Sequence, residues 1–229
     1  MNTGWQFINR LTHWSMSNQS KVCYTAIFSD YEELKEPEPV TPGWRYVCFT
    51  DQPLKSDVWE IVHMDCIDTP QRTARWCKIM GWIDWQYSMW IDASFYIKKD
   101  LNDWWAERFV TPFSAAMHPL RTDIYAEARS CIVNNRGDNG KVLLQEQRYK
   151  QMLFPQHTGI ITSGIMLREN TTENIKLHEA WWKELSEQSV RDQLSFAYVS
   201  YRIPWINTYR WDYTQSKEFI YTKHKHLRH

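Results

Sequence analysis

Short apolar runs alternate with longer amphipathic segments along most of this chain. Runs rich in aromatic and β-branched residues are typical of strands buried in a sheet, and they occur at Val22–Phe28, Arg45–Asp51, Val58–Met64, Tyr87–Ile91 and Phe113–His118. A further apolar run, Gly159–Glu169, is interrupted by Ser163 and Gly164, where the backbone can come close to a ligand. Helices are predicted from Thr69-Pro70 onward and over Asp100–Phe109, Thr122–Val133, Lys141–Phe154, Glu173–Glu187 and Arg191–Arg202.

This alternation of strands and helices predicts an α/β fold, Rossmann-like, with a mostly parallel central sheet flanked by helices. No segment has the composition of a linker, so we expect one domain at residues 21–215. Residues 1–20 are expected to form an N-terminal arm, and residues 216–229 a basic, His-rich tail. No internal repeat or low-complexity tract interrupts this organisation.

The stretch Tyr87–Leu101 places an acidic residue, Asp92, where an apolar run stops. Ligands of open α/β sheets bind just outside the carboxyl ends of the strands, so Asp92 with Ser94 is well placed to hold a metal-bound phosphate. Asp51 ends an apolar run in the same way. The alternative for Asp92 is a cap that accepts backbone N–H groups of the next turn.

Arg72, Arg75 and Lys78 follow one another at intervals of three along the helix that begins at Thr69-Pro70. Positions three apart lie on neighbouring turns of one face, so these cations can converge on one target such as a phosphate group. The alternative is a solvated helix face. The glycine-rich patterns GxGxxG and GxxxxGK[ST] are both absent, so a bound nucleotide would be held in another way.

Composition narrows the class of partner. The chain has 229 residues with 27 basic and 27 acidic side chains, which gives no global field to attract nucleic acid or an anionic membrane. Its five scattered cysteines contain no CxxC pair, which argues against a disulfide framework and a zinc knuckle and favours a reducing cytoplasm. No apolar segment has the length of a membrane span or of a signal peptide. The 14 Trp and 12 Tyr residues suit a packed core and, secondarily, carbohydrate faces and nucleobases.

Several segments in order resemble a known family: YTAIFSDYEELKEP, CFTD, Arg72-x-x-Arg75, YSMWIDAS, the HP-x-R of His118 to Arg121, TSGIMLRE and VRDQLSF. They are similar to the glycosyltransferase-like family first known as a domain of unknown function in plant Golgi proteins and in bacteria, over about residues 22–209. The family looks like a GT-A glycosyltransferase, and the late SGIML and DQ segments are similar to its glycogenin-like branch.

The resemblance implies a reaction and roles for particular residues. WIDAS lies where such enzymes keep an acid-x-acid metal motif, so Asp92 would bind Mn²⁺ or Mg²⁺ on the diphosphate of a sugar nucleotide, with a UDP-sugar as the expected donor. Ser94 stands where the motif has its second acid. A hydroxyl is a poorer ligand for a hard cation than a carboxylate, so we expect a lower affinity for the metal ion or a reaction that does not need it. A late His of the glycogenin-like pattern corresponds to His224 or His226. The resemblance places contacts to the base at Thr25, Ala26 and Tyr31, and a contact to the base or ribose at Asp51. It places contacts to the acceptor or sugar at His118 and Arg121, and Ser163 and Gly164 are expected at the donor.

The chemistry assigns two tasks to the site. Glycosyl transfer passes through an oxocarbenium-like state while a nucleoside diphosphate leaves, which requires positive charge on the phosphates and a carboxylate or carbonyl near the anomeric carbon. Arg72, Arg75 and Lys78 suit the first task, together with metal-bound Asp92. Asp192, beside Gln193 at a helix start, suits the second by holding sugar hydroxyls or acting as a base, and its alternative is a helix cap.

Three functions remain open from the sequence. The first is a hexosyl- or pentosyltransferase, bacterial or phage-encoded, that uses a sugar nucleotide. Its acceptor would be a polysaccharide, a protein or a modified DNA base. The second is an inactive carbohydrate- or nucleotide-binding module of the same fold. The third, a metal-dependent phosphohydrolase using Asp51 and Asp92, is disfavoured because no His and Asp cluster with two-metal spacing is visible.

Overall fold

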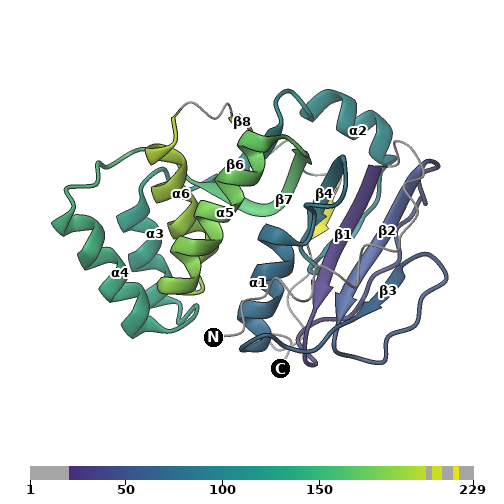
Figure 1. The fold of residues 1–229 in the computed structure, drawn as a ribbon, viewed down its shortest axis with the longest axis horizontal. Coiled ribbons are helices and arrows are strands. Elements are labelled where there is room, and N and C mark those ends of the chain that lie inside the picture. Colours follow the sequence, from purple (N-terminus) through teal and green to yellow (C-terminus); the bar gives the residue numbers. More distant parts are fainter. Residues whose placement is uncertain (1–20, 205–207, 213–218, 222–229) are drawn as a thin grey trace.

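The structure is a computed structural model that describes residues 21–204, 208–212 and 219–221. These residues form one mixed α/β domain, built as a twisted sheet with helices on both faces (Figure 1). The predicted arm at 1–20 lies outside the described residues, as does the predicted tail at 216–229 apart from 219–221.

The central sheet, over the described residues, has seven strands in the order β3-β2-β1-β4-β7-β6-β8. Their bounds are β1 Lys21–Ile27, β2 Trp44–Thr50, β3 Glu60–His63, β4 Tyr87–Ile91, β6 Phe113–Met117, β7 Ile161–Glu169 and β8 Thr208–Trp211. β1, β2, β3 and β4 pair in parallel, as do β6 and β8, whereas β7 runs antiparallel to both of its neighbours. The predicted α/β class and mostly parallel sheet are confirmed, and β4 occupies the middle of the sheet.

The helices are α1 Pro70–Met80, α2 Leu101–Arg108, α3 Ile124–Val133, α4 Asn139–Gln151, α5 Thr172–Glu187 and α6 Asp192–Arg202. α1 begins as the sequence predicts, because the Thr69 hydroxyl caps it by accepting from the Arg72 amide, and Pro70 starts the helix. Strands of the second sheet, β5 Phe95–Ile97 and β9 Phe219–Tyr221, pair antiparallel.

Two apolar cores lie on opposite faces of the sheet. Tyr24, Trp82 and Trp181 belong to the core on the side of α1, α5 and α6, and Trp59 and Trp104 belong to the core on the side of α2. Most tryptophans are therefore explained by packing. All five cysteines, which fall within the described residues, are free, and Cys66 is the exposed one.

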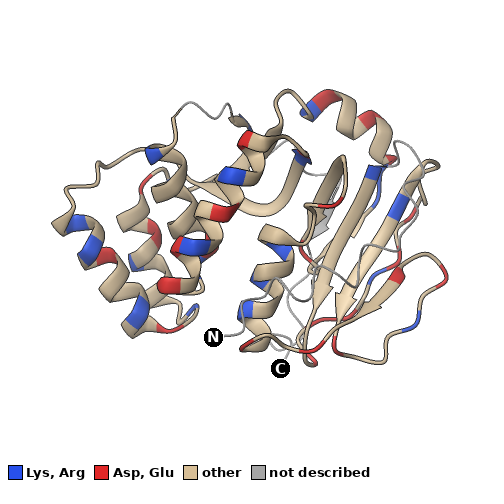
Figure 2. Cartoon of the chain, in the orientation of Figure 1, with Lys and Arg blue, Asp and Glu red and all other residues tan. Residues whose placement is uncertain are grey.

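No helix of the described part of the chain is long and apolar enough to cross a membrane. Basic and acidic positions are interspersed over the helices in Figure 2. This mixture agrees with the zero formal net charge of the sequence.

Candidate active site at the carboxyl end of the central strand

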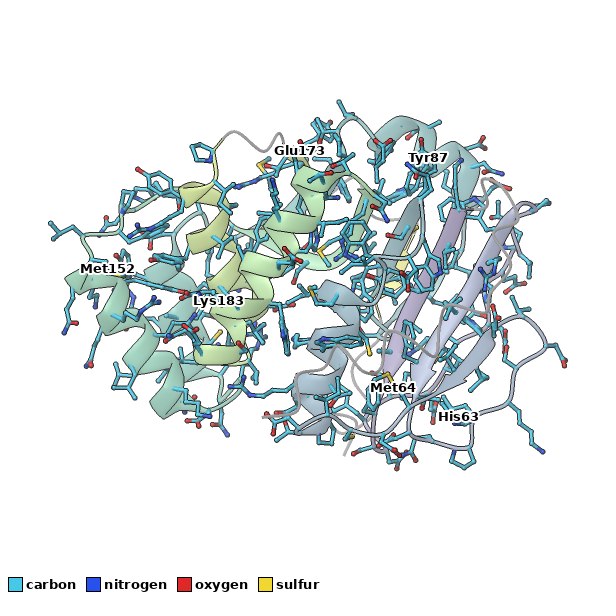
Figure 3. All side chains as sticks on the ribbon, viewed as in Figure 1. His63, Met64, Tyr87, Met152, Glu173 and Lys183 are labelled. Atoms are coloured by element: carbon cyan, nitrogen blue, oxygen red, sulfur yellow. The ribbon has the colours of Figure 1, made fainter. Side chains whose placement is uncertain are left out.

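The parallel strands bring their carboxyl ends to one edge of the sheet. Figure 3 places Tyr87, where β4 begins, at one end of the sheet, and His63, where β3 ends, at the opposite end. Asp92 follows β4 directly and therefore lies at the carboxyl edge, at the middle strand. This is the position where open α/β sheets bind ligands.

Lys78 of α1 contacts polar side chains from three other segments. Its ammonium nitrogen, Nζ, lies 3.1 Å from Asp92 Oδ1 and 2.8 Å from Asp192 Oδ2. It also donates to the Ser163 hydroxyl at 3.2 Å. We call these four residues the lysine cluster. The cluster joins α1, the end of β4, β7 and the first turn of α6, so the tertiary fold is what assembles it.

Asp192 is the most strongly perturbed carboxylate of the cluster. Burial alone would raise its pKa, but Arg75, Lys78 and Arg191 together hold the pKa of this carboxyl well below its usual value. Arg75 Nε lies 3.6 Å from Asp192 Oδ2, and the Ser163 hydroxyl donates to the same oxygen at 3.0 Å. Asp192 is therefore ionised at neutral pH, and a carboxylate of such low basicity is a poor general base.

Ser163 reaches the cluster through an unusual backbone conformation. Its φ angle is +53°, which places a non-glycine residue in the left-handed region. β6 and β7 lose regular register in this part of the sheet, between Ala115 and Met117, and such irregularities re-aim side chains next to functional sites. Gly164 follows, and its carbonyl accepts the Asp92 amide at 2.8 Å. A Cβ at Gly164 would lie 2.8 Å from the Phe95 ring, so glycine is required there.

A second polar network continues from the cluster along the same edge. Arg191 donates to Glu127 at 3.2 Å and to the Gln193 side chain at 2.8 Å. Arg121 donates to the other oxygen of Glu127 and lies 2.7 Å from His118 Nε2. Burial, and next the Arg121 charge, lower the pKa of His118, so its ring is neutral at neutral pH. His118, Arg121 and Gln193 are thus linked through Glu127 and Arg191 to the first turn of α6.

Arg72 points away from this assembly. Its guanidinium donates to the carbonyls of Leu185 at 3.3 Å, Ser186 at 3.0 Å and Gln188 at 2.8 Å, at the carboxyl end of α5. Of the three basic residues of α1, Arg75 and Lys78 meet at Asp192, and Arg72 instead satisfies terminal carbonyls of a neighbouring helix.

The residues predicted to contact the base form a separate group at the ends of β1 and β2. Asp51 accepts the Ser29 amide at 2.8 Å and the Gln52 side chain at 2.7 Å. Burial acts to raise the pKa of Asp51, but these two hydrogen bonds outweigh it and leave the pKa lowered. Thr25 is 1% exposed with its hydroxyl oxygen lacking a hydrogen-bond partner among the described residues, and Tyr31 is 44% exposed. Ala26, half-buried, packs against the core on the α1 side.

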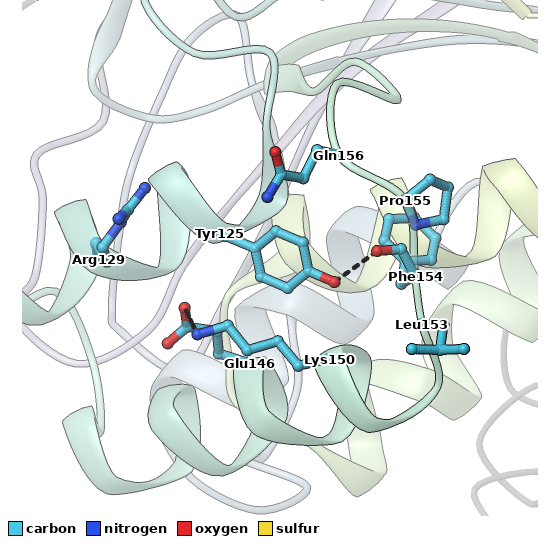
Figure 4. Close-up of a pocket in the computed structure, with 8 residues that line it drawn as sticks. All are labelled: Tyr125, Arg129, Glu146, Lys150, Leu153, Phe154, Pro155 and Gln156. Carbon is cyan, nitrogen blue, oxygen red and sulfur yellow. Dashed lines mark hydrogen bonds and ion pairs between the residues drawn. The ribbon is translucent and has the colours of Figure 1, made fainter.

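A hollow of about 550 Å³ lies elsewhere, between α3, α4 and the segment that follows α4 (Figure 4). Four of its lining residues contact each other in pairs: Tyr125 donates to the Phe154 carbonyl at 2.6 Å, and Lys150 Nζ lies 2.8 Å from Glu146 Oε1. None of its lining residues belongs to the lysine cluster or to the sequence-predicted set.

A family model described as TOD1/MUCI70, glycosyltransferase-like domain, matches residues 57–226. The chain belongs to this family. No curated protein matches the sequence. The matched range contains Asp92, Asp192 and the other members of the lysine cluster, whereas Thr25, Ala26, Tyr31 and Asp51 precede it. The predicted glycosyltransferase-like family is confirmed, and the GT-A type and glycogenin-like branch stay predictions.

For a metal ion, the residues of this glycosyltransferase-like domain give a poor donor set. The described residues contain no group of three or more His, Cys, Asp and Glu side chains that could hold one. Asp92 Oδ1 already accepts from Lys78 and, at 2.7 Å, from the Trp90 indole. Ser94 is 3% exposed in the turn between β4 and β5, and His224 lies outside the described residues.

Three members of the site were not among the predicted residues: Trp90, Glu127 and Arg191. Glu127 could have been found from the sequence pattern. It lies on the buried side of α3 with Ile124, Ala128 and Cys131, and a carboxylate on an apolar helix face requires a partner. Trp90 and Arg191 carried none beyond their proximity in sequence to Asp92 and Asp192.

Proposed function

We propose that this glycosyltransferase-like domain transfers a sugar from a nucleoside-diphosphate sugar, with a UDP-sugar as the expected donor, at the carboxyl end of β4. The observation that carries the proposal is the lysine cluster, in which Lys78 joins Asp92 and Asp192 at the edge of the sheet where ligands bind. In the reaction, the bond between the anomeric carbon and the diphosphate oxygen breaks, and the diphosphate keeps the electron pair. An acceptor oxygen forms the new bond, and its proton passes to the departing diphosphate, whose oxygen has gained the electron pair.

Asp92 is the group of the cluster best placed to touch the donor. Its side chain is 31% exposed, whereas those of Lys78 and Asp192 are 1% and 3% exposed. Within the described part of the chain, the hydrogen bonds to Asp92 side-chain oxygens go to Oδ1, which leaves Oδ2 to accept a sugar hydroxyl or to face the developing positive charge.

Arg75 is the cation best placed for the departing diphosphate. Its side chain is 28% exposed, and its guanidinium matches phosphate oxygens with several donors. Asp192, buried and of low basicity, then acts by fixing Arg75 and Lys78 rather than by taking the acceptor proton. This role favours a mechanism in which Asp192 is not the base.

The test is release of nucleoside diphosphate from a panel of UDP- and GDP-sugars, first without an acceptor and then with polysaccharide, protein and modified DNA. We expect one donor to be hydrolysed slowly, and Asp92→Asn to lower the rate by about a hundredfold. Asp103→Asn, an exposed position of α2, is the matched control and retains the rate.

If no donor in the panel is hydrolysed or transferred, the enzyme proposal fails. Binding of one donor without turnover would then support the alternative, an inactive binding module of the same fold.

A further inference from the structure

The ammonium of Lys78 fills the position between the two carboxylates of the candidate site. An ammonium group has three N–H donors, and Lys78 Nζ has three close acceptors: Asp192 Oδ2 at 2.8 Å, Asp92 Oδ1 at 3.1 Å and Ser163 Oγ at 3.2 Å. The side chain is 1% exposed, so water does not compete for these contacts. The cluster thus already contains a fixed cation held by oxygen atoms.

The backbone of Lys78 is fixed as firmly as its side chain. Its carbonyl accepts from Tyr24 Oη at 3.0 Å and from Arg168 Nη2 at 2.9 Å, and all three residues are buried. The Trp90 ring lies 5.6 Å from Nζ on a further side. Both ends of Lys78 are thus anchored, and these contacts hold its ammonium between the two carboxylates.

A divalent cation on Asp92 would therefore meet a positive charge already in place. Asp92 Oδ1 accepts from both Lys78 and Trp90, and Asp192 Oδ2 accepts from Lys78 and Ser163. Mg²⁺ and Mn²⁺ need several oxygen ligands near 2 Å, and like charges at the separation of this cluster repel strongly in a buried setting.

The charges around α6 already favour an anion. Arg75, Lys78, Arg121 and Arg191 face three carboxylates, those of Asp92, Glu127 and Asp192. The excess of positive charge is present without a metal ion.

We infer that Lys78 serves as a built-in cation in place of a divalent metal, so that the donor diphosphate binds and leaves without Mn²⁺ or Mg²⁺. This inference rests on the proposed function, because that function identifies the ligand as a donor diphosphate. The measurement of Mn²⁺ binding does not depend on the proposed function. Lys78 is a positioning residue in this scheme: its charge holds Asp92 and Asp192 in place, and Arg75 meets the phosphates.

The first experiment measures Mn²⁺ alone on the full chain by electron paramagnetic resonance and thermal unfolding. We expect no site at Asp92, and a shift in melting temperature below about 1 °C at millimolar Mn²⁺. Binding of one Mn²⁺ that is lost in Asp92→Asn overturns the inference. Mn²⁺ binding that persists in Asp92→Asn takes place at another site, and this result supports the inference.

The second experiment removes the internal cation. Lys78→Ala vacates a position lined by two carboxylates and a hydroxyl, so we expect this variant to melt earlier than wild type and to regain stability in Mn²⁺. The double variant Lys78→Ala/Asp92→Asn should gain nothing from Mn²⁺. A folded Lys78→Ala protein that ignores Mn²⁺ contradicts the inference, and if the variant does not fold, the wild-type Mn²⁺ measurement still decides.

A third measurement separates this inference from the proposed function. Donor hydrolysis in EDTA and in Mn²⁺ should agree within about twofold. Activity that EDTA abolishes and Mn²⁺ restores overturns the inference and supports glycosyl transfer. If neither hydrolysis nor transfer to an acceptor occurs under either condition, the proposed function is overturned, and the Mn²⁺ binding measurements then decide the role of Lys78.

Discussion

Lys78 Nζ and Asp192 Oδ2 lie 2.8 Å apart, with side chains 1% and 3% exposed. The pair connects the last turn of α1 to the first turn of α6. A buried ion pair becomes costly when one partner is removed, because the remaining charge is left without compensation in a dry environment. The pair therefore both joins α1 to α6 and forms part of the candidate site.

The two substitutions of this pair together should cost less than the sum of their separate costs. We expect Lys78→Met and Asp192→Asn each to lower the free energy of unfolding by about 3–5 kcal/mol. The double variant should lose less than the sum, with a coupling of about 1–3 kcal/mol. Urea unfolding of the four proteins measures this cycle, and strictly additive losses would mean that the two charges do not interact in solution.

The buried pair of Arg168 and His178 predicts how stability depends on pH. His178 Nε2 accepts from Arg168 Nε at 2.9 Å, and burial, then the Arg168 charge, hold the pKa of His178 well below its usual value. Because the folded-state pKa is below the unfolded value of about 6.5, the stabilisation is present above that pH and is lost as pH falls below it, by up to about 1.4 kcal/mol per pH unit.

His178→Gln should flatten this dependence, since glutamine does not titrate. Part of the slope should remain, because the pKa of His118 is also lowered. The exposed His157→Gln is the matched control and should leave the slope unchanged. Urea midpoints between pH 5 and pH 8 provide the measurement, and an unchanged slope in His178→Gln would contradict the assignment.

Local patterns in the sequence were sufficient for the elements and for the position of Asp92. Tyr87–Ile91 forms β4 as predicted, because an apolar run of that length has the composition of a buried strand. Strand direction is not encoded locally, so the antiparallel course of β7 was not predicted, and three-residue strands such as β5 and β9 are too short to give a periodic signal.

The candidate site was predictable in part for the same reason. A residue that follows a strand of a parallel sheet is placed at the carboxyl edge by topology alone, and this rule placed Asp51 and Asp92 there. Contacts between helices depend on how they pack. The sequence placed Arg72 on the same face of α1 as Lys78, yet the packing of α5 beside α1 determines which carbonyls Arg72 meets.

Gly164 should not tolerate a side chain. Its added Cβ would lie 2.8 Å from Phe95 Cε2 and 3.5 Å from Asp92 Oδ2, so we expect Gly164→Ala to cost about 1–3 kcal/mol by overpacking. Displacement of Asp92 should also lower donor turnover. Gly140→Ala, within α4, is the comparison and should change stability by no more than about 1 kcal/mol. A fully active and stable Gly164→Ala protein would mean that Phe95 moves aside freely.

Substitutions of Arg72 and Arg75 should affect different properties, the first the stability of the fold and the second donor binding. The two residues lie on one helix but have different contacts. Arg72 donates to three carbonyls at the end of α5, of which that of buried Leu185 is the most enclosed, so Arg72→Met removes their donor and should lower the free energy of unfolding by about 1–3 kcal/mol. The donor KM should stay close to that of wild type.

Arg75→Met should show the opposite behaviour. The Arg75 guanidinium is partly exposed beside Asp192, so its loss should raise the donor KM and lower kcat/KM by about tenfold to a hundredfold. Urea midpoints and steady-state kinetics on the same two proteins provide both readouts. If Arg72→Met instead raises KM at unchanged stability, then Arg72 leaves α5 to bind the diphosphate when the donor is present, and all three cations of α1 would converge on one ligand.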